Sequence, residues 1–265
     1  MPTFKYIRSL TLVSLATFIA GCTSSPTGRN QLLLFSDSQM NTLGTQSFDE
    51  LKQKQTIETD PTINRYVQCV ANSVTASVPK EGFDAWEVVV FKSDEINAFA
   101  LPGGKIGVYT GLLKVAKNED QLATVIGHEV AHVLAEHGNE RMSQSQLANT
   151  GIQLTSVVIG ASQYAQYQQL AMGALGVGVQ YGVLLPYSRK QESEADMIGV
   201  ELMNKAGFDA NQSIALWKNM AAASNGNQPP ELLSTHPSNQ TRIRDLTAEV
   251  SQLGKSNQSR PQCGI

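Results

Sequence analysis

The segment from His128 to His132 (HEVAH) constrains this chain more than any other part of its sequence. It lies in an apolar run with helical spacing, which Asn118 can cap and Gly138 can end, so we expect a helix up to His137. Residues i and i+4 of a helix lie one turn apart on nearly the same face, so both imidazoles can reach one metal ion. The fold must therefore pack this helix against an element that completes a metal site.

The residue types in this segment are those of a catalytic zinc site. Two neutral imidazoles and one carboxylate can hold zinc and leave a coordination position for water. Glu129 is rotated just far enough from the histidine face to stand beside the metal without binding it. There it can accept a proton from the attacking water and pass it to the leaving nitrogen. The alternative is a helix with two incidental histidines.

A second segment offers the third ligand. From Ser188 a capped helical pattern begins, and it places Glu192 and Asp196 on one face. We expect Glu192 to bind the metal and Asp196 to accept the second ring N–H of a zinc-bound histidine. Glu194 is expected on the other side of this helix, exposed to solvent. His137 follows His128 by about 900° of helical rotation, so we expect it on the opposite face, as a charge partner for the helix end.

The N-terminus has the pattern of an export signal. Two basic residues precede an apolar stretch from Leu10 to Ala20 that is too short to span a bilayer comfortably. The residues before and including Cys22 (IAGC) resemble a bacterial lipobox, in which the chain is cut before a cysteine that is then lipidated. We therefore expect a signal peptide over 1–21 and lipidation of Cys22; the alternative is an uncleaved anchor helix.

The residues after Cys22 suggest a location and a role for the segment they form. By resemblance to bacterial lipoproteins, Thr23 in place of an aspartate implies the outer membrane, facing the periplasm. Residues 22–35 begin with a stretch rich in Ser, Thr, Pro and Gly and are expected to form a tether. With Cys22 lipidated, Cys69 and Cys263 remain, and they either pair in an oxidising compartment or stay as two thiols.

Composition and patterning place the rest of the chain in the mainly α class with a small antiparallel β-sheet (α+β). The 265 residues carry a net charge of -3, which leaves no basic excess for binding nucleic acid. We expect one metallopeptidase domain over 36–254 and a polar C-terminal tail over 255–265. Helices are predicted over 36–55, 61–78, 211–223 and 238–253, and strands over 86–91, 97–101 and 105–109.

The stretch from 147 to 185 is the least readable part of the sequence. Polar residues interrupt every window of membrane-spanning length, so a transmembrane interpretation has little support. The family resemblance described below implies helices beside the active-site cleft, with a mobile part that covers it; the alternative is a glycine-rich pair of core helices.

The chain resembles the zinc metallopeptidase family of the CAAX prenyl protease and the periplasmic lipoprotein proteases. The resemblance lies in two motifs, HEVAH and, later in the chain, ESEAD within SRKQESEADMIG. The family is peptidase family forty-eight of the metallo class, in the gluzincin clan. Three further stretches are similar to its pattern: TGRNQ at 27–31, NAFALPGGKIGVYTGLL at 97–113 and THPSNQTRI at 235–243.

The resemblance implies a role for each matching residue. His128, His132 and Glu192 would bind one zinc ion per chain, with Glu129 as general base and Asp196 as the carboxylate behind a ligand. The strand of Asn97, Ala98, Phe99, Ala100 and Leu101 would be the edge to which an extended substrate adds; the alternative is a purely structural edge. His236 would ligate or cover the metal, or stabilise the oxyanion with Arg242 or Tyr187; the alternative is a helix-capping or merely exposed histidine.

Two function classes remain open. The first is a lipid-anchored periplasmic zinc metalloendopeptidase for quality control, with misfolded or unassembled outer-membrane and periplasmic proteins as substrates and no nucleic-acid partner. The second is a chaperone-like or assembly factor that binds clients and holds a structural or latent metal. An intact Glu129 favours the first, since a binding protein needs no general base beside zinc.

Overall fold

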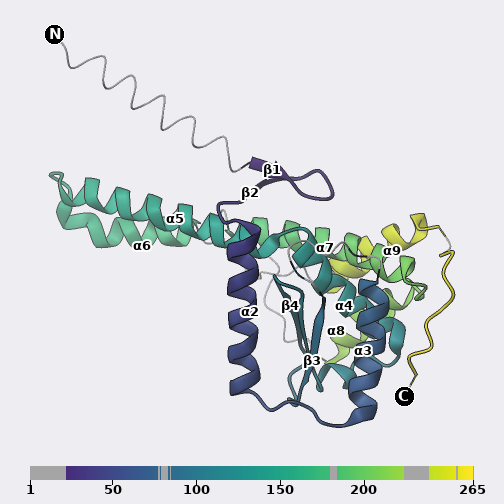
Figure 1. Cartoon of the computed structure of the whole chain (residues 1–265). Helices are drawn as coiled ribbons and strands as arrows, with labels where there is room; N and C mark the ends of the chain where they lie inside the picture. Colours follow the sequence, from purple (N-terminus) through teal and green to yellow (C-terminus); the bar gives the residue numbers. More distant parts are fainter. Residues whose placement is uncertain are drawn as a thin grey trace.

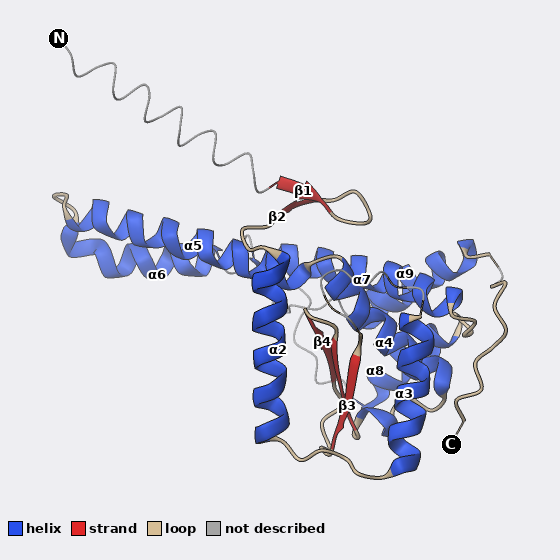
Figure 2. Ribbon diagram, viewed as in Figure 1, coloured by secondary structure: helices blue, strands red, loops and turns tan. Residues whose placement is uncertain are grey.

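Helix α4 (Glu119–Leu134), which carries HEVAH, lies at the centre of the packing (Figures 1 and 2). It contacts α3 (Pro61–Thr75), α7 (Leu185–Lys205), α8 (Gln212–Ala223) and the sheet strand β4 (Ala98–Leu101). The computed structural model describes residues 22–76, 78, 83, 85–179, 184–223, 239–254 and 256–264. The expected signal peptide over 1–21 and His236 lie outside these residues.

The remaining elements complete the structure. They are β1 (Cys22–Ser24), β2 (Asn30–Leu32), α2 (Asp37–Lys54), β3 (Glu87–Phe91), β5 (Lys105–Tyr109), η2 (Leu112–Lys114), α5 (His137–Gly160), η3 (Ala165–Tyr167), α6 (Gln168–Val179) and α9 (Asn239–Gln252). The predicted α+β class with helices in the majority is confirmed. Most predicted helices and strands start within a few residues of the observed ones because their caps are readable: Ser36 and Gln39 form a capping box for α2, and Asp60 caps α3.

The three-stranded sheet has the order β3-β5-β4 and is mixed. The β4–β5 pair is antiparallel, as predicted, but β3 and β5 are parallel, with Val89 opposite Gly107. The prediction of a wholly antiparallel sheet is wrong because β3 and β4 are not neighbours in the sheet. Strand β5 lies between them, antiparallel to β4 and parallel to β3. A turn through Gly103 and Gly104, both at positive φ, returns the chain to this position as β5.

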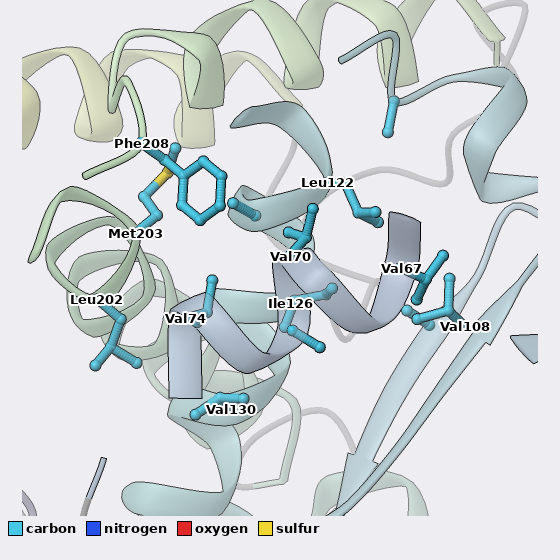
Figure 3. Close-up of a cluster of buried hydrophobic side chains, with 14 of the residues drawn as sticks. Val67, Val70, Val74, Val108, Leu122, Ile126, Val130, Leu202, Met203 and Phe208 are labelled. Carbon is cyan, nitrogen blue, oxygen red and sulfur yellow. The ribbon is translucent and has the colours of Figure 1, made fainter. Parts of the chain in front are cut away.

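The main core lies between α3, α4, α7 and the sheet (Figure 3). Helix α3 buries Val67, Val70 and Val74 at spacings of three and four residues, which form one helical stripe. The matching stripe of α4 adds Leu122, Ile126 and Val130, and Met203 of α7 and Phe208, three residues after that helix, pack against them. Because α4 is held by apolar contacts on this face, its histidines have a fixed position relative to the neighbouring helices.

Helices α4 and α7 approach each other at two glycines. A Cβ on Gly127 would lie 2.6 Å from the carbonyl oxygen of Gly199, and a Cβ on Gly199 would lie 2.7 Å from the backbone nitrogen of His128. Both distances are too short for a carbon atom, so the two backbones touch because neither residue has a side chain. This contact sets the distance between the histidines of α4 and the acidic residues of α7.

The substitution Gly199→Ala tests this contact. We expect it to lower the free energy of unfolding by about 1–3 kcal/mol, because the added methyl group forces the two backbones apart. Gly151→Ala is the matched control, since a Cβ there has no neighbouring atom within 4 Å and should leave stability unchanged or raise it by up to about 1 kcal/mol. Urea denaturation measures both, and equal stability of the two variants would contradict the tight-contact interpretation.

Helices α5 and α6 form an arm that projects away from the body of the molecule (Figure 1). Its large apolar side chains are mostly exposed, including Leu154, Val157, Val158 and Leu170 at 64–75%. The alternative of a pair of core helices is therefore wrong. Among the described helices, no segment has both the length and the apolar character needed to cross a membrane.

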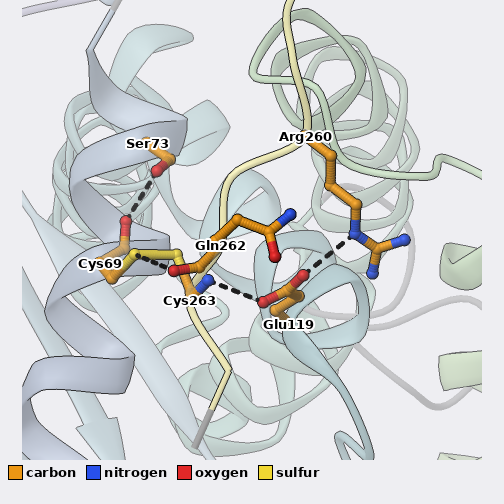
Figure 4. The surroundings of a disulfide bond; sticks show 6 residues. All are labelled: Cys69, Ser73, Glu119, Arg260, Gln262 and Cys263. Carbon is orange, nitrogen blue, oxygen red and sulfur yellow. Dashed lines mark hydrogen bonds and ion pairs between the residues drawn. A yellow bond between two sulfur atoms is a disulfide. The ribbon is translucent and has the colours of Figure 1, made fainter.

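Residues near both ends of the chain are held against the body. The expected tether over 22–35 contains the β1–β2 hairpin, and its Arg29 forms ion pairs with Glu140 and Glu194, so a flexible tether does not describe it. At the other end, the disulfide between Cys69 and Cys263 attaches the tail to α3 (Figure 4). Of the two alternatives left open by the sequence, the structure contains the paired one. Such bonds typically contribute about 2–5 kcal/mol to stability.

Candidate metal centre

Three side chains that the sequence singled out meet between α4 and α7. The Nε2 atoms of His128 and His132 are 3.1 Å apart. The two carboxylate oxygens of Glu192 lie 3.3 Å and 3.4 Å from these nitrogens. One potential ligand atom from each of the three residues lies within 4.8 Å of the other two, and all three residues are buried. Two imidazoles and one carboxylate in this arrangement are the donor set of a catalytic zinc site.

His128 is oriented by Asp196, as the helical spacing predicted. Its Nδ1 lies 3.0 Å from Oδ1 of Asp196, and a carboxylate can only accept, so the proton is on Nδ1 and Nε2 faces the metal position. Arg242 donates to both oxygens of the same carboxylate. Burial alone would raise the pKa of Asp196, but the charge of Arg242 and the hydrogen bond with His128 lower it, so the carboxylate stays ionised.

His132 is oriented by a residue that the sequence analysis assigned elsewhere. Its Nδ1 lies 2.8 Å from Nδ1 of His137, and Nε2 of His137 lies 3.1 Å from Oε2 of Glu194. Burial lowers the pKa of His137 to about 4, so its ring is neutral at pH 7. With the His137 proton on Nε2 facing the carboxylate, its Nδ1 accepts from Nδ1–H of His132. Nε2 of His132 then carries no proton, and its lone pair can bind a metal.

The point where the three groups meet favours positive charge. Burial and Arg242 both act against a charge on His128, yet hydrogen bonds to Asp196 and Glu192 raise its pKa to about 9. The fit to zinc rests on geometry: two imidazole nitrogens and a carboxylate converge on one point, and a hydrogen-bond partner holds the other ring nitrogen of each histidine, so the residues present fit zinc.

Glu129 and the predicted substrate strand lie together beside this point. Glu129 is half-buried, and burial followed by the nearby Glu192 carboxylate raises its pKa. The backbone N–H of Ala100, in β4, hydrogen-bonds to its carboxylate. Strand β4 is at the edge of the sheet order, paired with β5. The structure thus places a carboxylate of raised pKa between the histidine–glutamate group and a sheet edge.

Two predictions for this region are wrong. His137 does not continue α4, which ends at Leu134; Glu136 adopts a left-handed conformation (φ 50°), and α5 starts at His137. This sharp turn brings His137 back beside His132 instead of onto the far face. Glu194 is not solvated but buried, because α5 and the N-terminal hairpin cover that side of α7.

Arg242, which the resemblance offered as an oxyanion stabiliser, lies behind the metal ligands and binds the Asp196 carboxylate. Besides Asp196 it approaches Glu192, with Nη1 3.7 Å from Oε2, and its guanidinium carbon is 3.5 Å from the centre of the Trp217 ring. Its proposed partner Tyr187 has a side chain outside the described part of the structure, as does His236. Sequence reasoning missed the roles of Arg29, Glu140 and Gln191 in this region, although TGRNQ had been singled out as a motif.

The ionised Glu194 predicts how stability depends on pH. Burial acts to raise its pKa, but hydrogen bonds from Ser25, Thr27, Arg29 and His137 lower it from 4.5 to about 2. The carboxylate therefore stabilises the fold fully above about pH 4.5, and this contribution is lost as the pH falls toward 2.

The substitution Arg29→Gln should raise the pKa of Glu194 in the folded state and so reduce this loss. We expect the free energy of unfolding, measured in urea with excess chelator, to fall less between about pH 6 and pH 3 in the variant than in the wild type. Two parallel stability curves would contradict the assignment.

Comparison with known proteins identifies the family. The sequence model of the protein family described as "Peptidase family M48" matches residues 58–250. The chain therefore belongs to this family of zinc metallopeptidases. The resemblance inferred from HEVAH and ESEAD is thus confirmed, and zinc is the cofactor.

Named relatives come from mitochondria and from bacteria. The chain is 39% identical to the mitochondrial metalloendopeptidase OMA1 of Schizosaccharomyces pombe over 163 residues, which are 61% of this chain and 45% of the relative. It is 34% identical to OMA1 of Danio rerio over 236 residues (83% and 48%). It is 28% identical to the β-barrel assembly-enhancing protease of Escherichia coli over 202 residues (73% and 40%). The chain spans about half the length of these relatives or less.

Proposed function

We propose that this chain is a zinc metalloendopeptidase that hydrolyses peptide bonds of extended polypeptides. The observation that carries the proposal is the position of Glu129 between the His128, His132 and Glu192 group and the edge strand β4. A protein that used its metal for structure alone would need no carboxylate of raised pKa at this position. Family membership and the metalloendopeptidase names of the relatives support the same reaction.

In the proposed mechanism, Glu129 handles the protons. Zinc, when bound by His128, His132 and Glu192, lowers the pKa of a water molecule and polarises the substrate carbonyl. Glu129 accepts the proton of the attacking water and donates it to the leaving amide nitrogen. The raised pKa of Glu129 suits this role, since a carboxylate that holds its proton more tightly is a better base. Asp196 keeps the ring of His128 in the required tautomer.

Strand β4 is the proposed substrate platform. An extended peptide can add to a sheet edge through backbone hydrogen bonds, which recognise the main chain more than the side chains. A cavity of about 180 Å³ adjoins this strand, lined by Leu101, His132 and Val133 together with Met40 and Trp86. Its lining is mainly apolar, so we expect the preferred substrate to place an apolar side chain close to the bond that is cut.

The substitution Glu129→Gln tests the peptidase proposal. We expect hydrolysis of an unfolded protein to fall at least about 100-fold, because the general base is lost, while bound zinc stays at one ion per chain. Glu50→Gln, on an exposed position of α2, is the matched control and should keep full activity. Cleavage is followed by gel electrophoresis and zinc by elemental analysis.

Other outcomes would favour the alternative function. If the wild type holds zinc, cuts no unfolded protein and still suppresses its aggregation as well as Glu129→Gln does, the peptidase proposal fails. The chain would then act as a client-binding or assembly factor. If Glu129→Gln loses zinc as well as activity, the assignment of Glu129 as base alone is wrong.

We further propose that the mature chain begins at Cys22, carries lipid there and faces the periplasm from the outer membrane. Its clients would be misfolded or unassembled outer-membrane and periplasmic proteins. The apolar N-terminal segment followed by IAGC supports the anchor. The Cys69–Cys263 bond suits an oxidising compartment, and the bacterial relatives are named for β-barrel assembly.

The substitution Cys22→Ala tests the anchor. In bacteria that produce the full chain, we expect labelled palmitate to enter the wild type and to be absent from the variant, since the acceptor thiol is gone. The double substitution Cys69→Ala and Cys263→Ala is the control and should incorporate lipid normally. Equal labelling of Cys22→Ala and the wild type would exclude this site of attachment.

A further inference from the structure

The TGRNQ motif has no role in the reaction described so far. It forms the turn and second strand of the β1–β2 hairpin, where Gly28 adopts a positive φ of 83°. The hairpin precedes the M48 match, which begins at residue 58. Its polar side chains nevertheless reach α5 and α7, which lie more than 100 positions later in the sequence.

Two side chains of the motif bind the buried carboxylate of Glu194. Nε of Arg29 donates to Oε2 over 2.8 Å, and Oγ1 of Thr27 donates to Oε1 over 2.5 Å. The same Oε2 lies 3.1 Å from Nε2 of His137. Glu194 therefore has both oxygens occupied by donors from the hairpin and one of them shared with His137. A carboxylate held in this way can only accept from the ring, so it fixes the tautomer of His137.

The contact continues to a zinc ligand. His137 presents Nδ1 to Nδ1 of His132 at 2.8 Å. If the proton of His137 moved to Nδ1, the proton of His132 would have to move to Nε2, the atom that faces the metal position. The hairpin also binds the end of α4, since Gln31 donates through Nε2 to the carbonyl oxygen of Ala135, three residues after His132.

We propose that the N-terminal hairpin completes the zinc site, with Arg29 as a positioning residue that acts on His132 through Glu194 and His137. The inference rests on the proposed role of His132 as a zinc ligand. Its consequence is that residues ahead of the matched family region determine how tightly the site holds zinc. Partners of this kind behind a metal ligand typically change metal affinity by about 10–100-fold.

A second branch of the same contact provides an internal control. The Nη1 and Nη2 atoms of Arg29 donate to both oxygens of Glu140, each over 2.7 Å, and Gln191 donates to the same carboxylate. This branch holds α5 and α7 together but does not reach a ligand nitrogen through His137. A purely structural hairpin would make both branches equally important for zinc.

The test compares zinc affinity in variants of the two branches, using the full mature chain and a competing chelator. We expect Glu194→Gln and Arg29→Gln to bind zinc about 10–100-fold more weakly than the wild type. Thr27→Val, a milder change, should weaken zinc binding in the same direction by a smaller factor. Glu140→Gln should lower stability in urea while keeping zinc affinity close to that of the wild type.

A second measurement reports the tautomer directly. Nitrogen NMR of the zinc-loaded wild type should place the His132 proton on Nδ1, and Glu194→Gln should disturb this signal while Glu140→Gln should not. If Glu194→Gln and Thr27→Val fold, keep wild-type zinc affinity and leave the signal unchanged, the hairpin is only a clamp and the inference fails. If the wild type itself binds no zinc, the proposed peptidase function fails as well. Failure of the hairpin inference alone differs from this, because there the wild type still binds zinc.

Discussion

The contact between α4 and α7 is the constraint on which the site depends. Gly127 directly precedes His128, and Gly199 follows Glu192 and Asp196 by seven and three residues, which places all three α7 residues on one helical face. Where the glycines touch, the backbones cannot slide apart or rotate without losing contact. The acidic face of α7 is therefore held opposite the histidine face of α4 at the distance that three metal donors require.

The site also requires that each buried carboxylate behind a histidine is paired with a positive charge. The structure provides this pairing in the same way on both sides of the metal position. His128 is backed by Asp196, which Arg242 neutralises, and His132 is backed through His137 by Glu194, which Arg29 neutralises. An unpaired carboxylate at either place would carry a large desolvation penalty. One arginine comes from the N-terminal hairpin and the other from α9, so distant parts of the chain must fold together before either histidine is fully oriented.

The parts of this site that could be predicted from sequence are those set within one helix. Spacing within α4 and within α7 placed His128, His132, Glu192 and Asp196 on inward faces, because side chains three or four positions apart share a face. Spacing could not reveal what packs on the opposite face of α7, and so Glu194 was expected in solvent. The predicted position of His137 required α4 to continue to that residue, but the helix ends at Leu134.

Features that depend on neighbouring segments were the ones predicted poorly. A left-handed residue such as Glu136 leaves no periodic signal, since the interruption is one residue long. The small polar residues of 22–35 have the composition of a linker, yet Thr27 and Arg29 find buried partners in α5 and α7. The parallel β3–β5 pair likewise depends on the path between strands and not on the strand sequences themselves.

The disulfide has a topological consequence for a chain with a long projecting arm. Cys69 and Cys263 are separated by 194 positions, and the histidines, the arm and Glu192 all lie between them. A backbone cut in the arm would fall between the two parts of the metal centre, yet both fragments would remain one covalent molecule. Such a nick would be invisible on a gel until the sample is reduced, and the two halves would stay at high effective concentration for reassembly.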